Sequence, residues 1–181
     1  MRWKTCGEHY TDEGHVLYYS GELDRQANGV GFLVNKNIKN TVMGCCPISS
    51  RIITIRLRAA PFNITVIQAY APTSAYDDNQ VESFYAQLQE VIDKVHKKDI
   101  LIIQGDWNAK VGEDAQKDWK DICGGSCNSI TNDRGLRLLE FARYNNMVLA
   151  NTLGKHKPSR RWTWHAPNGR YHNHIDYIMV R

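Results

Sequence analysis

Apolar residues along the chain follow two spacings, and each spacing predicts one kind of element. Alternating or continuous apolar runs predict β-strands. They lie at 15–20, 30–34, 52–57, 64–69, 100–103, 147–150 and 174–180. Apolar residues three or four positions apart predict an amphipathic helix over 81–95, with Asp78 or Asn79 as its cap. A second helix is expected over 133–144, ending at Asn145-Asn146.

The order of these elements predicts the fold class. Strands in consecutive pairs, with helices between some of them, indicate an α/β or α+β arrangement rather than a regular βαβ repeat. In the run 52–57, Ile53 and Ile55 share one face and Thr54 and Arg56 the other, which suits an antiparallel strand wet on one side. The chain has 181 residues, 42% of them hydrophobic, and no internal repeat or linker, so we expect one domain over 1–181.

Polar residues follow or interrupt three of the predicted strands. Asp106 and Asn108 come after the apolar run 100–103 in the tetrapeptide Gly-Asp-Trp-Asn, and Tyr70 ends the run 64–69. The third is Asp176, within 174–180. A simple turn is the alternative for Gly-Asp-Trp-Asn, since turns recruit the same residues. Open α/β sheets place their chemistry at the carboxyl ends of strands, so the three strands together predict one site.

Cations and aromatic residues alternate near the carboxyl end of the chain. The stretch from 155 to 171 holds no acidic residue, and the net charge of the whole chain is +4. Its cations are Lys155, Lys157, Arg160, Arg161 and Arg170, and its aromatic rings are Trp162, Trp164 and Tyr171. Cations that neutralise phosphates, beside rings that stack on bases, predict a nucleic-acid surface. A solvated basic loop with two core tryptophans is the alternative.

Two compositional features bear on location. No apolar run is long enough to span a membrane as a helix, and Met1-Arg2-Trp3 is not followed by the apolar segment of a secretory signal. Five cysteines, two of them adjacent at Cys45-Cys46, fit reduced thiols better than a disulfide framework. We therefore expect an intracellular protein.

Taken together, the motifs resemble a known superfamily over nearly the whole chain. Tyr70 in Tyr-Ala-Pro, Asp106 and Asn108 in Gly-Asp-Trp-Asn, and Asp176 in Ile-Asp-Tyr resemble the endonuclease/exonuclease/phosphatase superfamily. That superfamily includes deoxyribonuclease I, abasic-site endonucleases and the endonucleases of non-LTR retrotransposons. The stretches 132–152 and 161–165 resemble the retrotransposon branch. The resemblance implies a deoxyribonuclease-I-like, four-layer sandwich of two mixed β-sheets flanked by helices.

The same resemblance implies a metal-dependent phosphodiesterase that nicks DNA with Mg²⁺ or Mn²⁺ and an activated water. Asp106 would orient the water or take its proton, Asn108 and Tyr70 would donate to the phosphate, and Asp176 would hold a histidine. Residue chemistry allows the first three roles. Substrate contacts are expected from Arg160, Trp164 and Asn108. DNA is the expected partner, the nucleus the expected location, and a reverse transcriptase or another domain can accompany this one in a longer parent protein.

Two expected segments of the superfamily have no match in the sequence. These are a first strand whose Glu binds Mg²⁺ and a Ser-Asp-His segment after Ile-Asp-Tyr, so we expect a domain that is partial at both ends. No spacing argument selects a substitute ligand among Glu8, Asp12 and Glu13, and the metal ligands stay unassigned. A catalytically impaired remnant that binds nucleic acid or protein is the alternative function. A phosphoinositide or sphingolipid substrate is a third reading.

Histidines and cysteines offer one more metal hypothesis. In His172-Asn173-His174 the two rings would share one face of a strand, a spacing that can bind metal. Cys123 and Cys127 would complete a zinc site only through a long-range coincidence. The simpler expectation is that His174 lies at a polar strand entrance beside the site.

Overall fold

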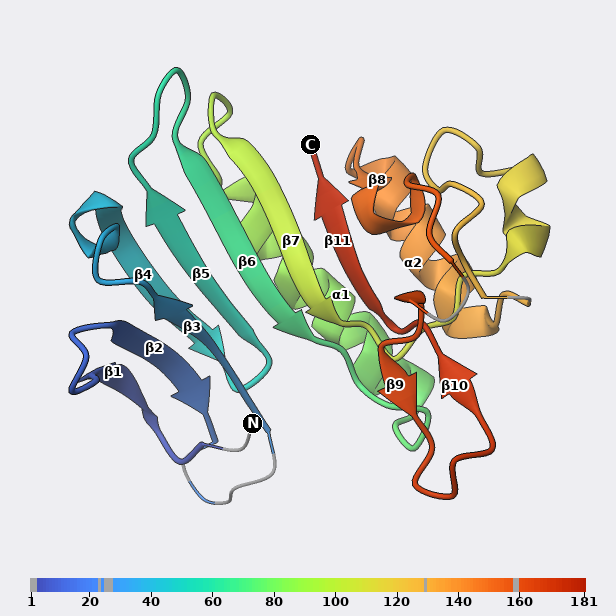
Figure 1. Cartoon of the computed structure of the whole chain (residues 1–181), viewed down its shortest axis with the longest axis horizontal. Coiled ribbons are helices and arrows are strands. Elements are labelled where there is room, and N and C mark those ends of the chain that lie inside the picture. Colours follow the sequence, from blue (N-terminus) through green and yellow to red (C-terminus); the bar gives the residue numbers. More distant parts are fainter. Residues whose placement is uncertain (1–2, 23, 25–27, 129, 158–159) are drawn as a thin grey trace. The chain divides into compact units, whose positions relative to one another are not determined.

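The structure is a computed structural model that describes residues 3–22, 24, 28–128, 130–157 and 160–181 (Figure 1). Chain contacts divide it into two compact units. The first comprises 1–70 and 82–103, and the second comprises 71–81 and 104–181. The expectation of one domain over 1–181 stays a prediction.

Two β-sheets build the first unit. One is antiparallel, with β1 (Cys6–Tyr10), β2 (Val16–Gly21) and β3 (Gly29–Val34) in that order. A short 3-10 helix, η1 (Lys39–Thr41), leads into the second sheet. The order there is β4 (Val42–Ser49), β5 (Ile52–Leu57), β6 (Ile64–Tyr70) and the first part of β7 (Ile100–Asp106), so β4 forms its edge. Strands β4 to β6 pair antiparallel, with breaks in register at both ends of β4.

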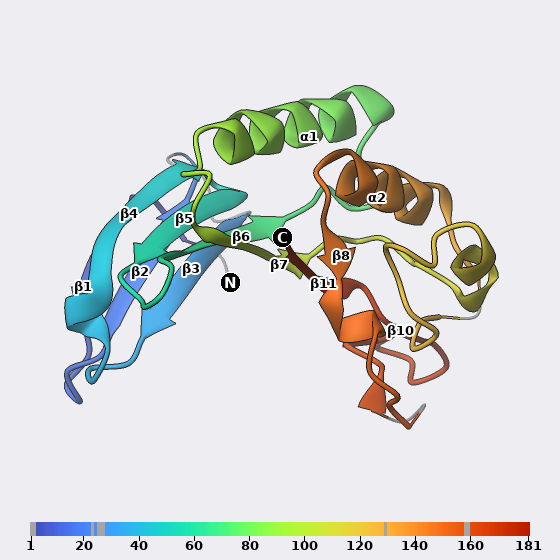
Figure 2. The same cartoon turned by 90° about the horizontal axis from the view of Figure 1, so that it is seen from above.

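The core of this unit lies on both faces of the second sheet. Its β4 and β5 contact β2, and β5 and β6 contact β3, while α1 (Asp78–Asp93) lies on the opposite face (Figure 2). Ile52, Ile53 and Ile55 are each at most 2% exposed, because one face meets the first sheet and the other meets the helix. The expected wet face of 52–57 is only partly wet, because α1 covers some of it and leaves Thr54 and Arg56 half-buried. Arg56, on that face, forms a two-bond ion pair with the buried Asp99.

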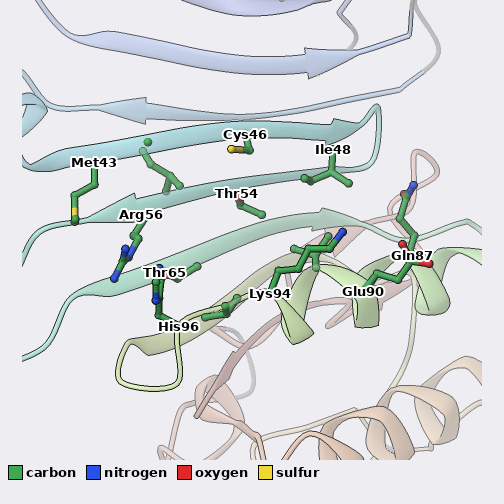
Figure 3. A pocket seen from close by; sticks show the side chains of 14 residues that line it. Met43, Cys46, Ile48, Thr54, Arg56, Thr65, Gln87, Glu90, Lys94 and His96 are labelled. Atoms are coloured by element: carbon green, nitrogen blue, oxygen red, sulfur yellow. The ribbon is translucent and has the colours of Figure 1, made fainter.

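Helix α1 leaves part of this face uncovered, and a groove of about 450 Å³ lies between it and strands β4 and β5 (Figure 3). Apolar side chains such as Met43, Ile48 and Val91 form most of its wall, with Lys94 on the helix side. A methyl group added at Gly44 would meet nothing within 4 Å, which shows that the groove is open there.

The second unit contains the last residues of β7, followed in strand order by β11 (Asp176–Val180) and β8 (Val148–Leu149). Helix α2 (Asp133–Tyr144) contacts β8. Its cap is Asn132, whose side chain accepts a hydrogen bond from the Gly135 nitrogen, and its buried face includes Leu138 and Leu139. The remaining elements are η2 (Glu113–Lys117), η3 (Ala150–Thr152) and a hairpin of β9 (Trp164–His165) and β10 (His172–Asn173).

The expected α+β class with two β-sheets is confirmed, as are both helices. The cap of α1 is Asp77 rather than Asp78 or Asn79, since the Gln80 nitrogen donates to the Asp77 side chain. The strands β1 and β4 were not predicted. All five cysteines are free. Among the described residues, no helix combines the length and the apolarity needed to cross a bilayer.

Candidate active site

The turn after β7 places Asp106 and Asn108 on either side of a buried anchor. Trp107 is 1% exposed, and its indole nitrogen donates to the Tyr177 carbonyl at 3.1 Å. The Ala71 nitrogen donates to the Asp106 carbonyl, and the Asn108 amide donates to the Ala71 carbonyl, both at 2.9 Å. The turn is therefore fixed to the segment that follows β6, and Asp106 and Asn108 are left half-buried at the strand end.

Asn108 adopts a backbone conformation that most residues avoid. Its φ is +48°, in the left-handed region, where asparagine is among the better-tolerated residues. The Asp106 carboxylate accepts a hydrogen bond from the Asn108 nitrogen at 3.0 Å, which closes the turn. The side-chain amide of Asn108 has two N–H groups, and the bond to Ala71 uses one of them. The other can serve a ligand.

Two substitutions at Asn108 separate the backbone strain from the hydrogen bond. Asn108→Gly loses the bond to Ala71 but tolerates the positive φ, so we expect it to lower the free energy of unfolding by about 1 kcal/mol. Asn108→Ala loses the same bond and adds strain of about 1 kcal/mol more. Urea denaturation of both variants measures the difference, and equal stabilities would show that the turn relaxes to a negative φ.

Burial and a second carboxylate change the acidity of Asp106. Desolvation, assisted by the nearby negative charge of Asp176, raises the pKa of Asp106 to about 6, against the opposing effect of the bond from the Asn108 nitrogen. A carboxyl group with such a pKa is ionised at neutral pH and still basic enough to accept a proton from water. Asp106, Asn108 and Asp176 thus come together in the second unit.

Asn151 positions the strand that carries Asp176. Its side-chain nitrogen donates to the Asp176 carbonyl at 3.0 Å, and its oxygen accepts from the Ile178 nitrogen at 3.0 Å. The same amide nitrogen lies 2.9 Å from Nε2 of His174. Because an amide nitrogen only donates, Nε2 accepts, and the proton of the neutral ring is on Nδ1. Sequence reasoning assigned Asn151 no role beyond a motif resemblance.

His174 lies beside the site, but not on a strand with His172. The short strand β10 ends at Asn173, and the His174 side chain is 4% exposed, so the expected shared face of the two rings is wrong. Burial lowers the pKa of His174, although Asp176 opposes that shift. Its Nδ1 is buried and has no hydrogen-bond partner among the described residues.

A buried asparagine, Asn128, holds the backbone of His174 through its side chain. Sequence reasoning did not identify it. The His174 nitrogen donates to its side-chain oxygen at 2.9 Å, and its amide donates to the His174 carbonyl at 2.8 Å. The Tyr177 hydroxyl donates to the same carbonyl and accepts from the Val111 nitrogen. An asparagine in a polar loop carries no pattern that reveals such a contact.

The other predicted site residues lie as follows. Tyr70 belongs to the first unit, where the Arg51 guanidinium lies 5.1 Å from the centre of its ring and donates to its carbonyl. Arg160 is exposed, and Trp164 is 40% exposed on β9, so a core position for Trp164 is wrong. Arg161 is already engaged, since it pairs with Glu113 at 3.1 Å.

Metal ligands remain few. The described residues contain no group of three or more His, Cys, Asp or Glu side chains that could hold an ion. Asp176 is close enough for its charge to affect the acidity of Asp106. Mg²⁺ commonly takes one or two protein carboxylates and completes its shell with water and phosphate, so Asp176 beside Asp106 fits such an ion. The groove beneath α1 contains neither residue and is mostly apolar.

Comparison with known proteins bears on this geometry. No protein-family model matches the chain. Craniofacial development protein 2 of Bos taurus is 40% identical over 181 residues, and that of Tragulus javanicus is 39% identical. Both alignments cover the whole chain but only 30% and 31% of these relatives, so the chain spans less than a third of their length. The motif stretches 132–152 and 161–165 had also suggested resemblance to such proteins, and this is confirmed.

Solved structures share the fold at low sequence identity. The endonuclease domain of TRAS1, a telomere-specific non-LTR retrotransposon, matches with a TM-score of 0.59 and 16% identity, covering 90% of this chain and 65% of that domain. The AP endonuclease LMAP from Leishmania major matches with a TM-score of 0.63 and 15% identity, covering 93% of this chain and 62% of that enzyme. The chain is therefore similar over its whole length to part of craniofacial development protein 2, and it has the fold of endonuclease/exonuclease/phosphatase superfamily enzymes.

Proposed function

We propose that the chain is a metal-dependent phosphodiester hydrolase that nicks DNA, with Asp106 as the group that accepts the proton of the attacking water. The observation that carries this proposal is the half-buried Asp106 carboxylate, whose pKa is raised to about 6 next to Asp176. Proton acceptors work best when their pKa lies near the operating pH. Asp106 meets that condition at the strand end where the turn also presents Asn108.

The neighbouring groups support the same reaction. The free N–H of the Asn108 amide can donate to a phosphate oxygen, while its other N–H holds the turn to Ala71. Tyr70 would add a phenolic donor, as the family resemblance implies. Asn151 and Asn128 act on the site indirectly, because they hold the backbone on either side of Asp176. We regard both as positioning residues.

A bound Mg²⁺ would supply positive charge to the phosphoryl oxygens. Asp176 would be the protein carboxylate that holds it, with water and phosphate oxygens completing its shell, so that Asp106 stays available to accept the proton. Mn²⁺ has similar ligand preferences and is the alternative ion.

DNA is the proposed substrate because the second unit, which holds the site, also carries exposed basic and aromatic residues. Lys155, Lys157, Arg160 and Arg170 are exposed in a segment without acidic residues, and Trp164 is exposed on β9. Cations of this kind bind phosphates, and an exposed indole can stack on a base. We extend the proposal to a retrotransposon-type endonuclease that acts in the nucleus, and the fold shared with the TRAS1 domain is compatible with the first part of it.

A second function is binding of nucleic acid without catalysis. One observation favours it. The described residues contain no group of three or more His, Cys, Asp or Glu side chains that could hold the metal ion needed for hydrolysis. The basic aromatic surface would then act alone. Binding of fluorescein-labelled DNA, measured by anisotropy, together with an absence of nicking at every pH would support this function over hydrolysis.

Nicking of supercoiled plasmid in Mg²⁺ tests the proposal directly. We expect activity that EDTA abolishes and that rises about tenfold per pH unit below pH 6, then levels off as Asp106 becomes fully ionised. Asp93→Asn is the matched control, because this exposed carboxylate on α1 lies in the other unit and should leave the profile unchanged. A rate that does not vary between pH 5 and pH 8 would contradict the assignment of Asp106.

A further inference from the structure

Two histidines face each other across the β9–β10 hairpin. His165 and His172 are directly paired in the antiparallel register, and their Nδ1 atoms are 2.6 Å apart. Their ring centres are 4.6 Å apart, and the ring planes meet at 70°. Both side chains are exposed. The H-x-H spacing considered in the sequence pointed to His172 and His174, and it did not suggest this pair.

The hairpin holds this pair in place through its own hydrogen bonds. The Ala166 nitrogen donates to the Tyr171 carbonyl at 2.9 Å, and the Gly169 nitrogen donates to the Ala166 carbonyl at 2.8 Å. Gly169 has a φ of +67°, which glycine adopts without strain, so the turn between the strands is tight. On the other side of His172, the ring of Trp162 stacks at 6.4 Å with an interplanar angle of 28°.

We infer that His165 and His172 form a binding site for a divalent transition-metal ion of the Ni²⁺ or Cu²⁺ type. Neutral imidazole nitrogens are preferred ligands of these ions. With metal–nitrogen bonds of about 2.0 Å, neighbouring ligands at a right angle are about 2.8 Å apart, and tetrahedral ligands about 3.3 Å apart. The observed 2.6 Å is nearer the first value, so the pair needs to open by only a few tenths of an ångström. That geometry favours tetragonal over tetrahedral coordination.

The site differs in chemistry from the Asp106–Asp176 pair. Two nitrogens select borderline transition metals, whereas two carboxylates select hard ions such as Mg²⁺. Because the described residues provide no third His, Cys, Asp or Glu around the two rings, the remaining positions on the ion belong to water or an external ligand. The binding is therefore that of a two-point chelate, in which the second imidazole acts intramolecularly.

Titration of the whole chain with Ni²⁺ tests this site, followed by calorimetry and by NMR of the histidine side chains. We expect one ion to bind and to broaden the ring signals of His165 and His172 before those of the other five histidines. This measurement needs no variant, so it does not depend on the folding of one. Uniform broadening of all seven histidines would overturn the site.

Variants then assign the ligands. His165→Asn and His172→Asn should each weaken Ni²⁺ binding by about tenfold or more, because each leaves a single imidazole. His9→Asn is the matched control: His9 is also exposed on a paired strand, but Leu17 lies opposite it, and Ni²⁺ affinity should not change. Equal affinities for all three variants would refute the chelate. Asp106→Asn should not alter the affinity, which keeps this test independent of the proposed hydrolysis.

Discussion

Replacing Asp106 with asparagine is expected to stop DNA nicking and, at the same time, to make the folded chain more stable at pH 8. The loss of nicking follows from removal of the proton acceptor, which contributes about 10²–10⁴-fold to hydrolytic rates. An asparagine oxygen can still accept the bond from the Asn108 nitrogen, so the turn is kept. The variant therefore separates the charge of Asp106 from its structural role.

The gain in stability follows from the raised pKa. Folding shifts the pKa of Asp106 from 3.8 to about 6, so the folded state binds the proton more tightly than the unfolded state does. The protonated Asp106 carboxyl contributes fully to the free energy of unfolding below about pH 4, and this contribution is lost as the pH rises through about 6. At pH 8 the ionised, half-buried carboxylate costs about 3 kcal/mol. A neutral asparagine avoids most of that cost.

Urea denaturation at pH 4 and pH 8, with plasmid nicking, measures both effects. Asp99→Asn is a control for which the change in stability should have the opposite sign. The Arg56 guanidinium lowers the pKa of the Asp99 carboxyl, so the charge of Asp99 stabilises the folded chain above the unfolded pKa. Its removal should destabilise the chain at pH 8. If Asp106→Asn also proved less stable than the unmodified chain at pH 8, the assigned burial of its charge would be wrong.

Substitution of Asn128 by alanine is expected to cause the largest loss of stability among changes that leave the candidate site residues intact. The substitution leaves the buried backbone N–H of His174 without its acceptor and removes one donor from the His174 carbonyl. Buried polar groups without partners cost about 1–3 kcal/mol each, and the lost side chain leaves a cavity as well. We therefore expect a decrease of about 3 kcal/mol in the free energy of unfolding.

Asn168→Ala serves as the matched control for that change. Asn168 is also a loop asparagine of the second unit, but it is exposed, and within the described part of the chain its side chain bonds only the Arg170 nitrogen. Stability should therefore change by less than about 0.5 kcal/mol. Urea denaturation of both variants makes the comparison. A loss at Asn128 no larger than that at Asn168 would show that water replaces the Asn128 side chain without cost.

Much of the fold could be predicted because its interior elements carry strong periodicity. Both helices and the strands β2, β3, β5, β6 and β7 bury apolar residues at regular spacing, which sequence displays directly. The strands β1 and β4 could not be found in this way. Every residue of β1 is exposed and most of β4 is too, so neither has an apolar face to reveal it.

Some residues of the candidate site could be predicted from sequence, and others could not. Asp106 and Asn108 end a recognisable strand, and the predicted proximity of Asp176 is consistent with its effect on the Asp106 pKa. Their catalytic roles stay predictions. Asn128 and Asn151 were missed because each acts through backbone groups far away in sequence, which leave no local pattern. The His165–His172 pair depends on hairpin register, which a two-residue strand does not disclose.

The irregular pairing of β4 has a consequence for how copies of the chain meet. An edge strand presents backbone groups that another strand can bind, and such edges promote aggregation. Here the register shifts between Val42 and Gly44 and again between Pro47 and Ser49, and Pro47 itself has no N–H to offer. The β4 backbone therefore does not offer a strand of a second chain a continuous row of hydrogen-bonding groups. Strand β4, which has no apolar pattern in the sequence, thus also resists extension of the sheet by another strand.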